Sequence, residues 1–373
     1  MIAPPVAVGE LAEQVRGVSY AKEDASDSPL PGYIPVLRAG NITDVGLVFN
    51  DLVYVPNERV SEKQRIRHHD VVVAASSGSL DVVGKAAPAL VDFEGGFGAF
   101  CKVLRPNDKV HPGYFAHFFK TPEYRRRVSA LAAGANINNL RNEHLDGMLI
   151  PLPPLPEQKH IADILDKADA LRAKRRAALA QLDTLAQSIF LNMFGDPSTN
   201  PKGIHRQPLG ELIKLKSGDF LPAAAMAESG TYPVLGGNGI SGFHDQYKFE
   251  EPQIVIGRVG AYCGCVHVSP AKSWITDNAL YVSERHPDLL FDYLVHALTH
   301  AHLNQYASQF GQPLVSGSRI YPVHVLVPPK SAQQEFVSRA AGVRDLKRTQ
   351  EMSQNQFDAL FASLQHRAFR GEL

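Results

Sequence analysis

Cysteine and long apolar runs are scarce in this sequence. Only three cysteines occur among 373 residues, too few for a disulfide framework and typical of a reducing compartment. No apolar run approaches the roughly 20 residues that span a bilayer, and the first residues lack the basic segment and apolar core of a signal peptide. These absences argue against a disulfide-rich secreted domain and a membrane protein, and they predict a cytoplasmic location.

Net charge is also lacking. Lys plus Arg total 38 and Asp plus Glu total 38, so the formal net charge is zero. A protein that binds nucleic acid alone usually carries a positive field. The balance therefore disfavours a lone DNA-binding protein. It is compatible with basic residues gathered on one face, or with a chain that works inside a larger assembly.

Catalytic motifs are missing as well. The nearest approach to a P-loop, Val83-Gly84-Lys85-Ala86, lacks both the loop and the hydroxyl. Neither Asp196-Pro197-Ser198 nor Asn200-Pro201-Lys202 forms the Asn/Asp-Pro-Pro-aromatic signature of amino-methyltransferases. Glu157-Gln158-Lys159 has the Glu-x-Lys form of some nucleases, but such triplets are common and this one opens a helix. We therefore predict no catalytic residue.

A metal site is not expected either. Cys263, Cys265 and His267 lie close together in the sequence, but a structural zinc site usually needs four ligands. No second cluster is placed to complete the set, so these cysteines are interpreted as incidental or buried thiols.

The chain does contain an internal repeat, which indicates two tandem copies of one unit. Leu152-Pro153-Pro154 corresponds to Val327-Pro328-Pro329, 175 positions later, and the same offset places Gln158 on Gln333. Further matches are Phe194 with Phe369, Tyr114–His117 with Tyr293–His296, Pro35–Ile42 with Pro233–Ile240, and Asp70–Ala74 with Gln253–Gly257. Chance similarity between two amphipathic helices would not explain the matches upstream of the helices.

Each copy ends in a predicted long helix. Prolines at 151–156 exclude a helix interior, whereas the residues from Glu157 to about Phe194 favour a helix that ends before Gly195-Asp196-Pro197. Seam positions alternate at spacings of three and four, which is a coiled-coil heptad pattern. The predicted seam consists of Ile161, Ile164, Ala168, Leu171, Arg175, Leu182, Leu185 and Ile189 in the first helix, and Phe336, Val343, Leu346, Gln350, Phe357, Leu360 and Leu364 in the second.

Both seams carry a polar residue at the same point, Arg175 and Gln350. A polar seam residue typically fixes the register of a coiled coil. If the helices are antiparallel about a two-fold axis, equivalent positions meet at the crossing point, and we expect Arg175 to contact Gln350 there. The alternative is that each helix packs on its own domain and leaves Arg175 exposed.

Two domain-sized blocks mix short β-rich runs with glycine turns. The expected strands include Asp70–Ala75, Leu80–Val83 and Gln253–Ile256, and the expected short helices include Tyr114–Phe119 and Phe291–Leu303. Glycine permits close approach of the backbone to a ligand, and Arg or Lys bonds guanine in the major groove or phosphates along the backbone. On this basis the candidate DNA contacts are Ser76, Ser77, Lys85, Arg125, Arg126, Arg127, Asn238 and Arg258.

The segment Ile150–Gln158, the helix that follows it, and the ending Ser188–Pro197 resemble the specificity subunits of type I restriction–modification enzymes. The resemblance covers essentially the whole chain, although Lys330 and Ala332 replace Leu155 and Glu157 in the second copy. It implies a non-catalytic subunit that recognises a bipartite site in double-stranded DNA, with one domain for each half-site. It also implies two modification subunits and motor–nuclease restriction subunits as partners. S-adenosylmethionine, ATP and Mg²⁺ are then expected on those partners, and no cofactor on this chain.

The implied fold is α+β: two α/β target-recognition domains in a pseudo-two-fold tandem repeat, separated by two long helices that form an antiparallel coiled coil. We expect the first target-recognition domain at 1–151, the first helical spacer at 152–197, the second target-recognition domain at 198–327 and the second spacer at 328–373. Two alternatives remain: a coiled-coil protein-binding scaffold and a self-contained DNA nuclease or methyltransferase.

Overall fold

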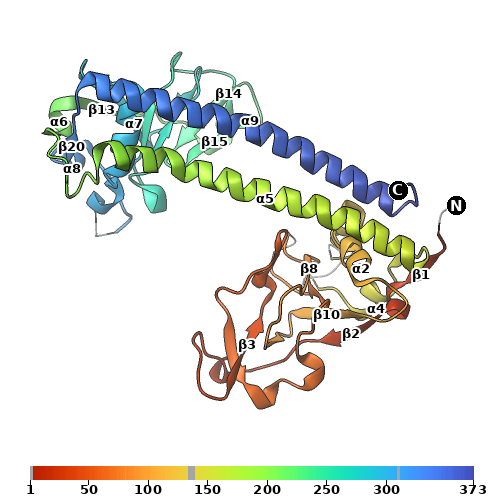
Figure 1. Ribbon diagram of the computed structural model, residues 1–373. Helices are drawn as coiled ribbons and strands as arrows, with labels where there is room; N and C mark the ends of the chain where they lie inside the picture. The colour runs from red at the N-terminus through yellow and green to blue at the C-terminus, as the bar shows by residue number, and fades with distance from the viewer. Residues whose placement is uncertain (1–2, 80, 133–138, 309–310) are drawn as a thin grey trace. The chain divides into compact units, whose positions relative to one another are not determined.

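Two long helices and two similar sets of strands make up the chain (Figure 1). The computed structural model describes residues 3–79, 81–132, 139–308 and 311–373. The chain forms two compact units, the first made of Met1–Ala177 with Glu351–Leu373 and the second of Ala178–Gln350. Each unit therefore contains one half of α5 (Leu155–Phe194) and one half of α9 (Lys330–Ala368).

The first unit holds a four-stranded antiparallel sheet in the order β2-β10-β7-β8, and a smaller sheet in the order β6-β3-β9. The strands of the larger sheet are Ala12–Arg16, Cys101–Pro106, Val71–Ala74 and Ala86–Pro88; those of the smaller are Val53–Pro56, Tyr33–Leu37 and Gly96–Phe97. Two strand pairs complete the unit: β1 (Pro5–Ala7) with β11 (Leu149–Pro151), and β4 (Ile42–Thr43) with β5 (Gly46–Leu47). Its short helices are α1 (Val8–Leu11), α2 (Pro112–Phe118), α3 (Pro122–Ala132) and α4 (Asn142–Asp146).

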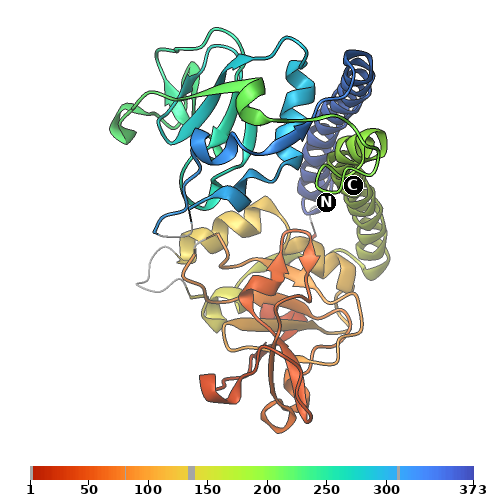
Figure 2. The same ribbon diagram turned by 90° about the vertical axis from the view of Figure 1, so that its left-hand side faces the viewer.

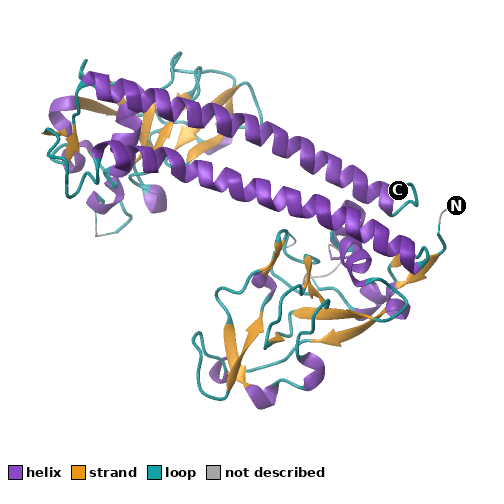
Figure 3. Cartoon of the chain, viewed as in Figure 1, coloured by secondary structure: helices purple, strands orange, loops and turns teal. Residues whose placement is uncertain are grey.

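The second unit repeats this topology. Its sheets have the orders β13-β19-β16-β17, β15-β14-β18 and β12-β20, each the counterpart of a sheet in the first unit. Figure 2 shows the ribbon from a second side, and Figure 3 shows which segments are helix, strand and loop. The strands, in those orders, are Ile213–Ser217, Ala279–Arg285, Ile254–Gly257 and Val266–Val268; Gly239–His244, Tyr232–Gly236 and Trp274–Ile275; and Arg206–Pro208 and His324–Leu326. The short helices are α6 (Leu209–Leu212), α7 (Phe291–His300) and α8 (Gly317–Ile320). The matching strand orders confirm the tandem repeat.

Buried apolar runs account for the central strands. All four residues of β7 and all four of β16 are buried, as expected for strands covered on both faces. The strands predicted at 70–75 and 253–256 are thereby confirmed, as are the helices predicted at 114–119 and 291–303, within a few residues. The strand predicted at 80–83 is wrong for its described part, because residues 81–84 form a turn that ends at Gly84 with a φ of +77°; Leu80 lies outside the described residues.

The repeated glutamine has the same structural role in both units. Gln158 and Gln333 are buried. The Oε1 atom of each accepts a hydrogen bond from the backbone N–H just before α2 or α7, at 2.7 and 2.9 Å. The Nε2 atom of each donates to the carbonyl of the first proline of the Pro-Pro pair, at 2.7 and 2.9 Å. The Pro-Pro-x-x-x-Gln pattern therefore ties the start of each long helix to the short helix beside it.

The helix halves run antiparallel in each unit. In the first unit Arg172 pairs with Asp358, whereas Arg175, further along α5, contacts Phe357, which lies earlier in α9. In the second unit Lys347 pairs with Asp183 at 2.5 Å, and Phe190, further along α5, lies 5.5 Å between ring centres from Phe336, which lies earlier in α9. The predicted antiparallel coiled coil is confirmed.

Of the fifteen residues predicted for the seam, eleven are buried or half-buried and four are exposed. Ile161, Ala168, Arg175, Leu182 and Ile189 are buried or half-buried, as are Ile164, Phe336, Val343, Gln350, Phe357 and Leu364. Four leucines assigned to the seam are instead exposed: Leu171 (59%), Leu185 (40%), Leu346 (47%) and Leu360 (55%). Two heptad patterns share the positions 161, 168 and 175 and differ in the residue between them. The prediction placed that residue three positions after each shared one, whereas the structure places it four positions after. Leu165 is therefore buried, and Arg172 takes the place predicted for Leu171.

Arg175 has a different partner from the one predicted. Its guanidinium donates a hydrogen bond to the Ser353 hydroxyl and lies 4.7 Å from the centre of the Phe357 ring. The contact expected with Gln350 is therefore replaced by one with Ser353. The Arg172–Asp358 pair sets the register of the two helices. In this register, residues that are equivalent in the repeat lie opposite each other about three residues beyond Arg175, so Arg175 itself does not face Gln350.

Candidate nucleic-acid interface

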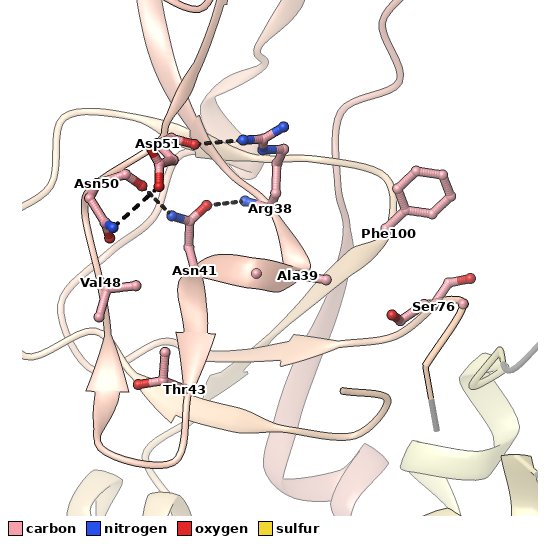
Figure 4. A pocket seen from close by; sticks show the side chains of 12 residues that line it. Arg38, Ala39, Asn41, Thr43, Val48, Asn50, Asp51, Ser76 and Phe100 are labelled. Carbon is pink, nitrogen blue, oxygen red and sulfur yellow. Dashed lines mark hydrogen bonds between the residues drawn. The ribbon is translucent and has the colours of Figure 1, made fainter. Parts of the chain in front are cut away.

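An open cleft of about 1060 Å³ lies at one end of the sheets in the first unit (Figure 4). Three loops form it: the turn after β3 with the β4–β5 pair, the turn after β7, and the loop between β9 and β10. Its lining is mostly small or polar, and consists of Arg38, Ala39, Gly40, Asn41, Thr43, Val48, Asn50, Asp51, Ser76, Ser77, Gly78 and Phe100.

Hydrogen bonds hold one wall of the cleft in place. Asn41 is buried; its Oδ1 accepts from the backbone N–H of Arg38 at 2.8 Å, and its Nδ2 donates to the carbonyl of Asn50 at 2.8 Å. The Arg38 guanidinium donates to the carbonyl of Asp51 at 2.7 Å and remains exposed. The buried Asn41 thus fixes the backbone from which the exposed Arg38 cation and Asn50 amide project, and such groups recognise phosphates and base edges.

The opposite wall carries an exposed aromatic side chain. The carbonyl of Phe100 accepts hydrogen bonds from the backbone N–H groups of Ala75 and Ser76, at 2.8 and 3.0 Å. Figure 4 shows Phe100 and Ser76 across the cleft from Asn41 and Asn50. The next residue, Cys101, is buried, and burial raises the pKa of its thiol to about 12, so it stays protonated and is a poor nucleophile near neutral pH.

The loops at the corresponding strand ends of the second unit are built differently, because the turn Gly237-Asn238 between β14 and β15 takes the place of the longer 38–52 loop. Asn238 is exposed in the turn between β14 and β15. Beside it, a Cβ atom on Gly237 would lie 3.3 Å from the carbonyl oxygen of Asn278, so this turn packs closely on the loop before β19. The Arg258 guanidinium donates to the Ser217 hydroxyl at 3.1 Å and to the Asp277 carbonyl at 3.3 Å.

Half of the predicted DNA contacts lie in these loops. Ser76 and Ser77 line the cleft of the first unit, and Asn238 and Arg258 occupy the corresponding loops of the second. Ser76, Ser77, Asn238 and Arg258 therefore remain predicted base or phosphate contacts.

The other predicted contacts lie away from the cleft. Lys85 pairs with Asp44 at 3.0 Å and lines a separate pocket with Arg125. Arg125 donates to two backbone carbonyls of the 81–84 turn, at 2.8 and 3.0 Å, so its donors hold that turn. Arg126 and Arg127 are exposed on α3. None of these three arginines lines the cleft, so the basic run is no part of it.

Sequence reasoning missed several residues of the cleft. Arg38, Asn50 and Phe100 were not selected, since three loops distant in the sequence supply them. A usable signal existed for Asn41, because the repeat aligns Gly40-Asn41 with Gly237-Asn238. No such signal marked Phe100.

The two neighbouring cysteines of the second unit lie in different surroundings. Cys263 is buried in the apolar core of the second unit, whereas Cys265 is exposed. Among the described residues no three His, Cys, Asp or Glu side chains converge as a metal site would require. Within the same residues, no helix combines the length and apolarity needed to span a membrane.

Comparison with known proteins gives consistent matches. A family model described as "Type I restriction modification DNA specificity domain" matches residues 5–181 and 201–346. The type I restriction enzyme EcoKI specificity subunit of Escherichia coli (strain K12) is 30% identical over 415 residues, covering 100% of this chain and 89% of that protein. The StySPI specificity subunit of Salmonella potsdam is 44% identical over 180 residues, which is 48% of this chain and 38% of that protein. A crystal structure of the type I system S subunit from M. genitalium shares the fold, with a TM-score of 0.59 at 17% identity over 98% of this chain and 96% of that one.

Proposed function

This chain belongs to the family of type I restriction–modification DNA specificity subunits, and we propose that it recognises a bipartite site in double-stranded DNA, with one half-site for each unit. Specificity subunits are the non-catalytic DNA-recognition subunits of their complexes. The observation that carries the proposal is the repeated set of strands, which keep one topology, whereas the loops between them differ in length and in side chains from one unit to the other.

The chemistry of the cleft suits base reading. Asn and Arg side chains have the donors and acceptors that distinguish bases in the major groove, and Ser bonds to either kind of edge. One small module reads only a few base pairs, which is too little to select a site in a genome. Two units joined through continuous helices supply a second set of contacts, and the helices set the gap between half-sites.

We further propose that each unit binds one modification subunit through its exposed leucines. Leu171 and Leu360 belong to the first unit, and Leu185 and Leu346 to the second, related by the 175-residue repeat. Exposed leucines at matched places on two polar helices favour a binding surface over chance exposure. Two such surfaces support a complex with two modification subunits, to which restriction subunits then bind.

The chemistry of the complex then resides on its partners. We expect S-adenosylmethionine on the modification subunits, ATP and Mg²⁺ on the restriction subunits, and no cofactor on this chain. Three cysteines without a disulfide among the described residues suit the reducing cytoplasm, where the cell's own DNA is modified.

The proposal is tested by reconstituting the chain with its modification subunits and mapping methylated bases on genomic DNA by long-read sequencing. The expected product is one motif made of two short specified parts separated by a gap of fixed length. A contiguous motif, or methylation without sequence preference, would contradict the proposal. If the chain acted only as a protein scaffold, omitting it would leave the specificity of methylation unchanged.

A further inference from the structure

Phe100 occupies a loop whose backbone is fixed at three points. The Gly98 N–H donates to the Leu37 carbonyl, and the Cys101 N–H donates to the Gly98 carbonyl, both at 2.8 Å. The Phe100 carbonyl in turn accepts from the N–H of Ala75 at 2.8 Å. The loop between β9 and β10 is thereby held against the ends of β3 and β7.

The second unit has the same three bonds around Asn278. The Thr276 N–H donates to the Leu235 carbonyl at 2.8 Å, and the Ala279 N–H donates to the Thr276 carbonyl at 3.0 Å. The Asn278 carbonyl accepts from the N–H of Arg258 at 3.0 Å. Phe100 and Asn278 are therefore structurally equivalent, although the two loops differ in sequence.

Neither side chain supports its own fold. Phe100 is 68% exposed, although the backbone of its loop is held by three hydrogen bonds. Asn278 is exposed too, and within the described residues only its backbone forms hydrogen bonds. A large apolar ring in water lowers solubility and adds nothing to the core. Its place at the rim of a cleft lined with Arg38, Asn41 and Asn50 indicates that a ligand covers it.

The two side chains differ in the groups they offer. A phenyl ring has no conventional donor or acceptor, so it discriminates bases through apolar contact, and the C5-methyl of thymine is the apolar group in the major groove. A carboxamide offers one donor and one acceptor side by side, which matches N7 and N6–H₂ of adenine.

We infer that Phe100 and Asn278 are the equivalent specificity-determining positions of the two units, Phe100 contacting a thymine methyl in one half-site and Asn278 bonding an adenine edge in the other. This inference rests on the proposed DNA-recognition function. It assigns different bases to one shared loop position, and so explains how the repeat keeps its backbone while its two halves read different sequences.

The test uses the complex of the full chain with its modification subunits, and competition binding to duplexes that carry the site mapped for the wild type. Each thymine of the site is replaced in turn by uracil, which removes only the methyl group. Replacing one thymine in one half-site should lower the affinity of the complex for the duplex about tenfold, the size of a lost base contact. Phe100→Ser should abolish the sensitivity to that uracil, whereas Phe100→Leu should keep part of it.

The second arm replaces each adenine by 7-deazaadenine, which removes the N7 acceptor. One adenine in the other half-site should be sensitive in the wild type and insensitive in Asn278→Ser. Leu90→Ser provides a matched control, because Leu90 is an exposed apolar residue of the first unit outside the cleft; it should leave every base preference unchanged. The half-site read by the unmutated unit reports whether each variant complex is intact.

The results separate the inference from the proposed function. If the wild-type complex shows no bipartite specificity, the proposed function itself is wrong. If the wild type reads a bipartite site but no thymine methyl is coupled to Phe100, the inference is overturned while the function stands. Equal weakening on all sequences in Phe100→Ser also overturns it, because that pattern denotes a non-specific contact with DNA.

Discussion

In the first unit Arg172 of α5 forms an ion pair with Asp358 of α9, with a nitrogen–oxygen distance of 2.5 Å. Arg172 also pairs with Asp169 at 3.0 Å and lies 4.2 Å from the centre of the Phe361 ring. A guanidinium in the seam is thus shared by two carboxylates and an aromatic face. Such a group fixes alignment between helices, because any shift in register leaves charges unpaired.

Asp358→Asn is expected to lower the free energy of unfolding by about 1–2 kcal/mol at pH 7, since it leaves a partly buried Arg172 with one fewer carboxylate. Burial acts to raise the pKa of Asp358, but hydrogen bonds from Gln354 and Arg172 outweigh it and hold the pKa below its ordinary value. The stabilisation is therefore present above the unfolded-state pKa of about 4 and is lost as pH falls through the lower folded-state pKa.

Urea unfolding between pH 7 and 3 checks this prediction. The variant should show a shallower loss of stability on acidification than the wild type. Glu143→Gln is the control, because the Arg141–Glu143 pair is mostly exposed and should change stability by less than about 0.5 kcal/mol. Parallel acid profiles for Asp358→Asn and the wild type would contradict the assignment.

Gln158→Leu is expected to destabilise the first unit by about 2 kcal/mol or more. The substitution leaves a backbone N–H and a proline carbonyl without partners in a buried place, and each such group costs about 1–3 kcal/mol. Gln333→Leu should do the same in the second unit. Gln181→Leu, on the exposed face of α5, is the matched control. Equal thermal stability of all three variants would show that the glutamines are not structural.

The same glutamine shows how much the sequence could predict. The 175-residue repeat and the helix after each Pro-Pro pair followed from residue identity and spacing. The role of Gln158 did not, because the N–H that it accepts from belongs to His111, 47 positions earlier in the chain. The sequence could not show which of two heptad patterns forms the seam, since Ile161 and Ala168 belong to both. Only tertiary contacts decide between Leu171 and Arg172.

The cleft was predictable in part. Ser76 and Asn238 lie in glycine-rich turns that the sequence displays, so their loops were found. Arg125 lies in a basic run that resembles a phosphate-binding patch, but its guanidinium donates hydrogen bonds to the backbone carbonyls of Val83 and Asp81. Phe100 could not be found, because its significance arises only when three distant loops meet around it.

His300→Phe is expected to flatten the acid dependence of stability in the second unit. His300 stacks on Phe190 at 4.3 Å, and burial, with the neighbouring His296 and His302, lowers its pKa to about 4. Its Nε2 atom is buried without a partner in the described residues. Because the folded-state pKa lies below the unfolded-state value of about 6.5, the unfolded chain binds more protons between pH 6.5 and 4, and stability falls as pH drops through that window.

Phenylalanine keeps the stacking and removes the proton-binding site, so stability at pH 7 should hold or rise. Urea melts at pH 7, 6 and 5 compare the variant with the wild type. His205→Phe, at an exposed position of the same unit, should retain the wild-type slope. The assignment to His300 fails if the variant loses as much stability between pH 7 and 5 as the wild type does.

Replacing Leu171 and Leu360 with serine should reduce the number of bound modification subunits from two to one. Both side chains are largely exposed, so the substitutions should leave the melting temperature nearly unchanged. Replacing Leu185 and Leu346 should have the same effect through the second unit, and all four substitutions should abolish binding. Native mass spectrometry of the reconstituted complex counts the subunits. Two subunits on the fourfold variant would exclude these leucines as the docking surface.

Lengthening both helices should lengthen the gap between half-sites without changing the bases read. The two compact units meet in sequence at Ala177/Ala178 in α5 and at Gln350/Glu351 in α9. Seven residues inserted at both points keep the heptad phase and the antiparallel pairing on each side, and they add about 10 Å of helix at 1.5 Å per residue. With base pairs spaced about 3.4 Å apart, the gap should grow by about three base pairs. An insertion in α5 alone should instead mismatch the helices and lower stability, which serves as the control for pairing. Methylation mapping gives the gap directly, and an unchanged gap in an active complex with both insertions would show that the helices do not set the distance.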